Sequence, residues 1–279
     1  MKKLLIASTA LVVSAGFAAA DVAVTGSASM GVKLNDGDMS MHNEIDFNIV
    51  GSGTTDGGLT FGASLDVDGE SHAVTTTGTV SDAEVYISGA FGTLTVGNIS
   101  NGADIGGISD LGFDDIGVDD AGEAGRLEGA YDTHFKTTFA DFTVTLSLDS
   151  EGGGDYGLGV AYAAGDFTVA LGTSRDDSAG DTASHITAGG TFGDVAAKVT
   201  YTSAADGTTG TGIQLGYTIG AIDTTVVWSD NTTAGQEASY GVGFAYDLGG
   251  GAALKGAIGS IHDGTSRASV ADLGVTMSF

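Results

Sequence analysis

Acidic side chains crowd one stretch of the sequence, residues 100–128. This stretch carries a single base, Arg126, against the acids Asp104, Asp110, Asp114, Asp115, Asp119, Asp120, Glu123 and Glu128. Carboxylates are the oxygen ligands that Ca²⁺ prefers, and a ring of them in a confined aqueous space concentrates cations. The same stretch also holds the apolar residues Ile105, Ile108, Leu111, Phe113, Ile116 and Val118. A fully solvated loop has no need of these, so the pattern predicts a packed loop with an acidic rim. An external acidic loop facing water is the alternative.

The adjacent pairs Asp114/Asp115 and Asp119/Asp120 are the candidate calcium ligands within this stretch. Ca²⁺ takes six to eight oxygen ligands, and neighbouring carboxylates supply several of them. No loop of the chain has the spacing of an EF-hand, so carboxylates that are merely screened by salt are the alternative. Apart from calcium, no cofactor is expected.

Catalytic chemistry has little support in the sequence. The chain has no Cys, and its 5 His residues are scattered. Neither a Gly-x-Ser-x-Gly nucleophile motif nor a His-Glu-x-x-His zinc motif is present. The sequence therefore predicts that the protein is not an enzyme, although Ser, His and Asp residues from distant strands could converge in the fold.

Strict alternation of apolar and polar residues marks the elements that must position the acidic stretch. It runs through residues 59–68, 142–149 and 195–202, for example, and period two places one residue set on each face of a β-strand. Seven tight connections alternate along the chain with eight longer ones, which predicts sixteen strands. The longer connections are expected near residues 35–40, 69–81, 100–128, 151–154, 175–181, 204–210, 231–236 and 261–266.

An even number of strands joined by alternating short and long connections is typical of an outer-membrane barrel with short periplasmic turns and longer external loops. No apolar run is long enough for a membrane-spanning helix. The formal net charge of −27 argues against binding to nucleic acid. The predicted fold is therefore all-β: a transmembrane, antiparallel, up-and-down barrel of sixteen strands formed by residues 21–279.

The two ends of the chain support this interpretation. Lys2 and Lys3 precede an apolar segment and three alanines at residues 18–20, which predicts a signal peptide cleaved after Ala20. An N-terminal membrane anchor is the alternative. Residues 273–279 alternate and end on the aromatic Phe279, so they are expected to close the barrel against residues 22–34. Such an exported chain is expected to meet outer-membrane lipid and the barrel-assembly machinery.

Strand parity predicts which charged residues face the lumen. The expected inward bases are Lys33, Lys136, Lys198 and Lys255, together with His42, His134 and His185. The expected inward acids are Glu44, Asp46, Asp66, Asp68, Glu84, Asp132 and Asp149. Acids outnumber lysines on the strands and outnumber bases on the long loop, so a passage lined by them should prefer cations.

Several segments resemble one known family, the Rhodobacter-type general porins of alphaproteobacterial outer membranes. They are residues 22–32 (VAVTGSASMGV), 52–64 (SGTTDGGLTFGAS), 87–94 (ISGAFGTL), 246–252 (YDLGGGA) and 270–275 (VADLGV). The resemblance implies a homotrimer of sixteen-stranded barrels that pass small hydrophilic solutes. It also implies that the third external loop, residues 100–128, folds inward and narrows the lumen. The family places a cluster of bases across the lumen from this loop, and the sequence shows no matching cluster.

Together these observations predict a porin that lets small hydrophilic solutes and ions diffuse passively across the outer membrane, with a preference for cations. Two alternatives stay open. One is a secreted, acidic, glycine-rich β protein that binds calcium and has a structural or adhesive role. The other is a barrel channel specific for one solute.

Overall fold

The computed structural model describes residues 21–72, 75–123, 131–151, 154–176 and 180–279. The predicted signal peptide, residues 1–20, lies outside the described residues, as do Arg126 and Glu128 of the acidic stretch. None of the described segments forms a helix that is long and apolar enough to cross a membrane.

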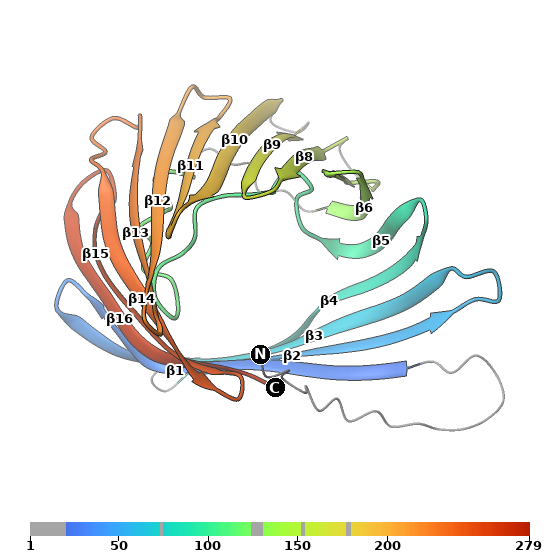
Figure 1. Ribbon diagram of the computed structural model, residues 1–279, viewed down its shortest axis with the longest axis horizontal. Helices are drawn as coiled ribbons and strands as arrows, with labels where there is room; N and C mark the ends of the chain where they lie inside the picture. Colours follow the sequence, from blue (N-terminus) through green and yellow to red (C-terminus); the bar gives the residue numbers. More distant parts are fainter. Residues whose placement is uncertain (1–20, 73–74, 124–130, 152–153, 177–179) are drawn as a thin grey trace.

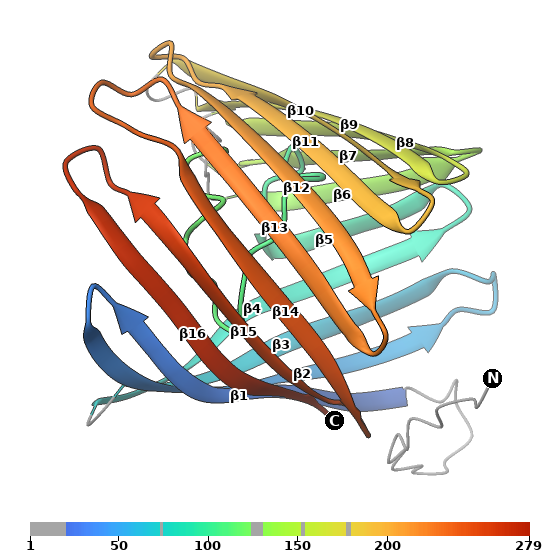
Figure 2. The same cartoon turned by 60° about the vertical axis from the view of Figure 1, so that its left-hand side comes forward.

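Sixteen antiparallel strands form one closed barrel, in which each strand pairs with its neighbours in the sequence and β1 pairs with β16 (Figures 1 and 2). This confirms the predicted fold class. The strands are β1 Asp21–Asn35, β2 Asp38–Thr54, β3 Thr60–His72, β4 Thr75–Gly89, β5 Gly92–Ile99, β6 Tyr131–Phe139, β7 Phe142–Leu148, β8 Tyr156–Ala164, β9 Phe167–Asp176, β10 Asp181–Phe192, β11 Val195–Ser203, β12 Thr209–Ile219, β13 Ile222–Asn231, β14 Ser239–Gly249, β15 Ala252–His262 and β16 Arg267–Ser278.

The last strand closes the barrel against the first. The β1–β16 register runs from Ser27 opposite Ser278 to Asn35 opposite Val270. Beyond it, Gly26 and Phe279 exchange two backbone hydrogen bonds of 2.7 and 2.9 Å, and the Phe279 ring contacts Phe47 edge-on at 5.7 Å between centroids. Closure leaves no unpaired strand edge, which is what a wall surrounded by hydrocarbon requires.

The wall has an apolar outer face and a polar inner face. Leu171, Ile213, Val226 and Ile258 are among the large apolar side chains exposed on the outside. Aromatic side chains, including Phe139, Phe167 and Phe192, are exposed beside the short turns. An apolar band bordered by aromatic rings is the outer surface of a barrel that sits in a lipid bilayer.

Two connections are shorter than the sequence predicts. The one expected near residues 35–40 is a two-residue turn, in which Asp36 and Gly37 have φ of 50° and 94°. Positive φ at both positions is the geometry of a tight hairpin turn that suits Asp-Gly. The connection expected near residues 69–81 is also mostly strand, because β3 extends to His72 and β4 begins at Thr75. These segments are polar because the paired strands continue beyond the lipid into water, not because the chain leaves the sheet.

The two faces can be tested with neighbouring residues on β13. Val226 is exposed on the outer wall near the middle of the strand, and Thr225 faces the lumen. We expect Val226→Lys to lower the free energy of unfolding by about 2–4 kcal/mol, because it moves a charge into hydrocarbon. We expect Thr225→Lys to have a much smaller effect. Urea unfolding in lipid vesicles, followed by fluorescence of Trp228, measures both values. Equal losses in the two variants would contradict the assignment of faces.

Candidate functional site

The connection between β5 and β6 folds into the barrel. We call its described part, residues 100–123, the inner loop. Figures 1 and 2 show it as a green trace inside the ring of strands. Near its start, the Gly102 N–H donates to Ser147 Oγ on β7 at 2.8 Å. Further along, Lys33 Nζ on β1 donates to the Asp114 backbone oxygen at 2.9 Å. The inner loop therefore lies along the inner wall from β7 to β1, with the inner faces of β3 to β5 across the barrel from it.

Glycines on the inner wall make room for this loop. A Cβ added at Gly241 would lie 3.0 Å from both Leu111 and Val118, and one at Gly274 would lie 2.6 Å from Phe113. At Gly172, an added Cβ would overlap the backbone oxygen of Ala103. A larger residue at any of these wall positions would force the loop to shift, and at Gly172 it would collide with the loop backbone itself. We call the glycine-rich inner surface of β8 to β16 the loop seat.

The apolar side of the inner loop is buried against this seat. Leu111 is 2% exposed and Val118 is not exposed. They belong to one apolar cluster with Ile108 and Ile116 from the loop and with Val227, Ala257 and Val270 from the wall. This packing explains why a strongly acidic segment also carries large apolar residues.

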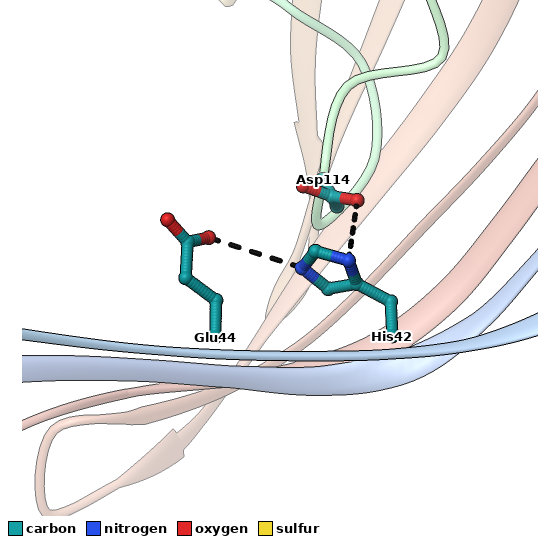
Figure 3. Close-up of side chains that lie close together, drawn as sticks. All are labelled: His42, Glu44 and Asp114. Atoms are coloured by element: carbon teal, nitrogen blue, oxygen red, sulfur yellow. Dashed lines mark ion pairs between the residues drawn. The ribbon is translucent and has the colours of Figure 1, made fainter. Parts of the chain in front are cut away.

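Two basic side chains of the wall, Lys33 and His42, contact Asp114, and Figure 3 shows His42 between Asp114 and Glu44. Lys33 Nζ lies 2.7 Å from Asp114 Oδ2, and His42 Nδ1 lies 3.3 Å from the same oxygen. The other ring nitrogen, His42 Nε2, lies 3.8 Å from Glu44 Oε2. The imidazole of His42 thus stands between two carboxylates, one on the loop and one on the wall. The charge of Asp114 is directed at the wall, and it offsets Lys33 instead of facing the lumen.

Asp272 on β16 holds the backbone of the same loop segment. Its Oδ2 accepts the N–H groups of Phe113 at 2.9 Å and Asp114 at 3.2 Å, and its Oδ1 accepts the N–H of Ala257 at 2.8 Å. Parity places Asp272 on the inner face, but the sequence analysis did not include it among the site residues. The signal that could have found it is a lone acid at an inward position of this strand.

Asp110, Asp115 and Asp119 gather their carboxylates on the inner loop, with one ligand oxygen from each within 4.8 Å of the others. Asp119 is only 4% exposed, and its Oδ1 has no hydrogen-bond partner. Burial raises the pKa of Asp119 to about 8, helped by the neighbouring charges of Asp115 and Asp110. Burial also raises the pKa of Asp115. The group contains two of the four predicted calcium ligands, Asp115 and Asp119, and adds Asp110. Of the other two predicted ligands, Asp114 forms an ion pair with Lys33, and Asp120 is not part of the group.

The remaining acids of the inner loop have separate roles. Glu123 Oε1 accepts the N–H of Ile108 at 3.1 Å and so holds the loop on itself. Asp120 is exposed, and burial of part of its carboxyl raises its pKa, as does the charge of Asp110. Asp104 is exposed at the start of the loop.

The inner face of β2, β3 and β4, which borders the inner loop at Asp114 and at Asp104, is acidic. On β2, Glu44 and Asp46 alternate with outward apolar residues; on β3, Asp66 and Asp68 do the same. Asp46 lies opposite Asp68 in the register, and the side chain of Asn48 donates to Asp66 Oδ1 at 2.7 Å. The parity of β4 places Glu84 on the same inner surface. These residues form what we call the acidic wall: Glu44, Asp46, Asp66, Asp68 and Glu84.

A polar cavity of about 340 Å³ lies between the start of the inner loop and the wall. Its charged or titratable lining residues are Glu84, Asp104, His134 and Lys136. Lys136 therefore shares this space with two carboxylates. The other predicted wall residues lie elsewhere. Asp132 accepts the Oγ–H of Ser150 at 2.7 Å near the external rim, and Lys198 lies on the inner face of β11 opposite Gln214.

Known proteins match the chain over nearly its whole length. The family model described as Gram-negative porin matches residues 7–266. The porin of Rhodobacter capsulatus is 28% identical, in a match that covers 93% of this chain and all of that protein. Two engineered variants of the Rh. blastica porin, which are 20% and 22% identical, superpose with TM-scores of 0.82 and 0.79 over 92% of this chain and all of theirs. An inner loop packed inside a sixteen-stranded barrel, with a match of this extent, places the chain in the Gram-negative porin family.

Proposed function

We propose that this outer-membrane porin forms a passive diffusion channel for small hydrophilic solutes and ions, and that the channel prefers cations. The observation that carries the proposal is the charge of two surfaces that line the lumen, the acidic wall and the inner loop. The acidic wall presents carboxylates from β2, β3 and β4. The inner loop adds the exposed acids Asp104, Asp110 and Asp120.

Among the described residues, the inward lysines do not balance these acids. Lys33 is paired with Asp114, and Lys136 lines a cavity with Glu84 and Asp104. Lys198 and Lys255 lie on β11 and β15, away from the acidic wall. A passage lined by one sign of charge raises the local concentration of counter-ions. The acidic wall stands where the resemblance led us to expect bases, which favours a cation preference.

Removing two carboxylates from the acidic wall tests the cation preference. We expect the protein in a planar bilayer to give a reversal potential of cationic sign in a salt gradient. Each lumen charge contributes on the order of 0.5 kcal/mol to a passing ion about 8 Å away in water. Each charge acts with opposite sign on cations and anions, and 0.1 M salt screens about half of this energy over such a distance. The double variant Asp46→Asn/Asp68→Asn should therefore lower the cation-to-anion permeability ratio roughly fivefold.

The matched control is Asp141→Asn, which changes an exposed acid in the short turn between β6 and β7. This variant should keep the original ratio. A reversal potential of anionic sign for the unmodified protein would overturn the proposal.

We propose in addition that the carboxylates of Asp110, Asp115 and Asp119 hold a calcium ion on the inner loop. Oxygen ligands from three carboxylates suit Ca²⁺, and the buried Asp119 oxygen without a hydrogen-bond partner is a ligand atom that a cation would satisfy. The raised pKa of Asp119 supports this, because burial and the neighbouring charges of Asp115 and Asp110 disfavour its ionised form, and a bound cation would offset both effects.

Calcium is expected to raise the midpoint of thermal unfolding, and Asp119→Asn is expected to abolish the rise. At a concentration 100 times the dissociation constant, a bound ion adds about 2.7 kcal/mol of stability. Asn imitates the protonated acid, so the variant should fold. Binding should tighten as the pH rises through about 8, where Asp119 gives up its proton. The control Asp104→Asn should keep the response, and an unchanged midpoint in the unmodified protein would contradict the site.

We also propose a homotrimer that the barrel-assembly machinery inserts, and no catalytic role. The resemblance to general porins supports the trimer, and molar mass by light scattering in detergent tests it. A channel specific for one solute is the remaining alternative, and a concentration-dependent block of the current would reveal it. A secreted calcium-binding β protein is set aside, because the chain is a porin with an apolar outer wall.

A further inference from the structure

The outer wall is hollowed where β13 to β16 meet β1. A lower hollow of about 630 Å³ is lined mainly by Val32, Leu34, Val242, Phe244, Ile258 and Leu273. A second hollow of about 420 Å³ is lined by residues that include Val226, Tyr240 and Ser260. Val242 and Ile258 line both hollows, so the two form one groove. We call it the outer groove.

Small residues at outward positions create the outer groove. Gly256 faces outward between two large side chains, and a Cβ there would lie 3.0 Å from Phe244 and 3.1 Å from Leu273. Ala271, another outward residue, lines the lower hollow. From Tyr240 to Phe244 the groove follows β14 for about 13 Å. A long, narrow, apolar groove on the membrane-facing wall suits a flexible acyl chain.

A cation stands at the external end of the outer groove. Arg267, the first residue of β16, donates from Nη1 to Ser260 Oγ at 3.0 Å, and its guanidinium carbon lies 5.5 Å from the centre of the Tyr240 ring. Both Ser260 and Tyr240 line the upper hollow. Among the described residues, strand parity turns one other arginine or lysine outward, Arg175 near the external end of β9. Elsewhere the acidic chain would repel an anionic lipid.

The existing partner of Arg267 does not block an anion. Arg267 Nη2 lies 3.0 Å from Glu237 Oε2, but the Glu237 side chain is 66% exposed and Arg267 is 33% exposed. Exposed pairs of this kind contribute little to stability, because water screens both charges. A phosphate offers more charge and several oxygens, and the guanidinium fork matches it in a bidentate geometry.

We propose that the outer groove binds a phosphate-bearing lipid of the outer leaflet. One acyl chain lies along Val242, Ile258 and the space above Gly256, and the lipid phosphate contacts Arg267. The outer-membrane location places acyl chains against this face, and the charge of Arg267 selects the headgroup. This proposal does not depend on the ion preference of the lumen.

Native mass spectrometry of the detergent-purified protein tests the proposal with lipid A and with lipid A from which the phosphates have been removed. We expect Arg267→Gln to lower the affinity for lipid A roughly tenfold, which corresponds to about 1.4 kcal/mol. Ala271→Phe, which fills the lower hollow, should lower the affinity for both lipids. The matched controls are Arg175→Gln and Ala188→Phe, which change an outward arginine and an outward alanine on β9 and β10. Both controls should bind like the unmodified protein.

Three results would overturn the proposal. They are equal binding of lipid A and its dephosphorylated form, unchanged binding in Arg267→Gln, and an Ala271→Phe variant that loses a partner copy while it keeps the lipid. If Ala271→Phe does not fold, the Arg267→Gln comparison still decides, because that substitution lies on an exposed surface. Single-channel conductance should stay unchanged in Arg267→Gln, which separates this site from the function of the lumen.

Discussion

The inner loop can lie flat inside the barrel only because the wall beneath it lacks side chains. Gly172, Gly241 and Gly274 stand where any Cβ would collide with the loop. Close approach buries Leu111 and Val118 against the wall, and burial on one side of the loop turns its exposed acids toward water. With larger residues at these wall positions, the same segment would have to move away from the wall into the lumen. The loop seat therefore sets both the width of the passage and the direction of its charges.

The contribution of each acid of the inner loop to the charge of the lumen depends on its contacts, and these differ between neighbouring acids. The carboxylate of Asp114 is paired with Lys33, so its charge is largely cancelled at the wall. Asp119, five residues further on, is buried beside Asp110 and Asp115, and its pKa rises to about 8. Asp104 is exposed in a polar cavity. The field in the lumen thus depends less on the number of carboxylates than on which of them meet a cation, another acid or water.

The sequence predicted more of the fold than of the contacts in the candidate site. Alternation is a local property, so it revealed the strands, their inward faces and the closure by the last strand. It failed in residues 38–40, 69–72 and 75–81, which are strand and not loop, because polar paired strands beyond the lipid look like loops in a sequence. Packing is not local. The hydrogen bond from the Phe113 N–H to Asp272 forms because the inner loop crosses β16 at this point. Neither the loop sequence nor the strand sequence contains a pattern that predicts the crossing point. The glycines of the seat were hidden because the chain has 48 of them.

The barrel wall is a single sheet, so alternate residues of each strand contact the lipid and the lumen. On β16, residues with roles on opposite faces are direct neighbours in the sequence. Ala271 and Leu273 face outward and line the outer groove. Asp272 and Gly274 face inward: Asp272 accepts hydrogen bonds from the inner loop, and Gly274 leaves room for Phe113 of that loop. Side chains of opposite parity do not touch, so lipid and loop act on the same strand only through its backbone. The ladder to β15 and β1 holds that backbone in register. A rigid ladder therefore lets one strand carry a lipid contact and a pore contact at consecutive positions, and parity assigns each substitution to one of them.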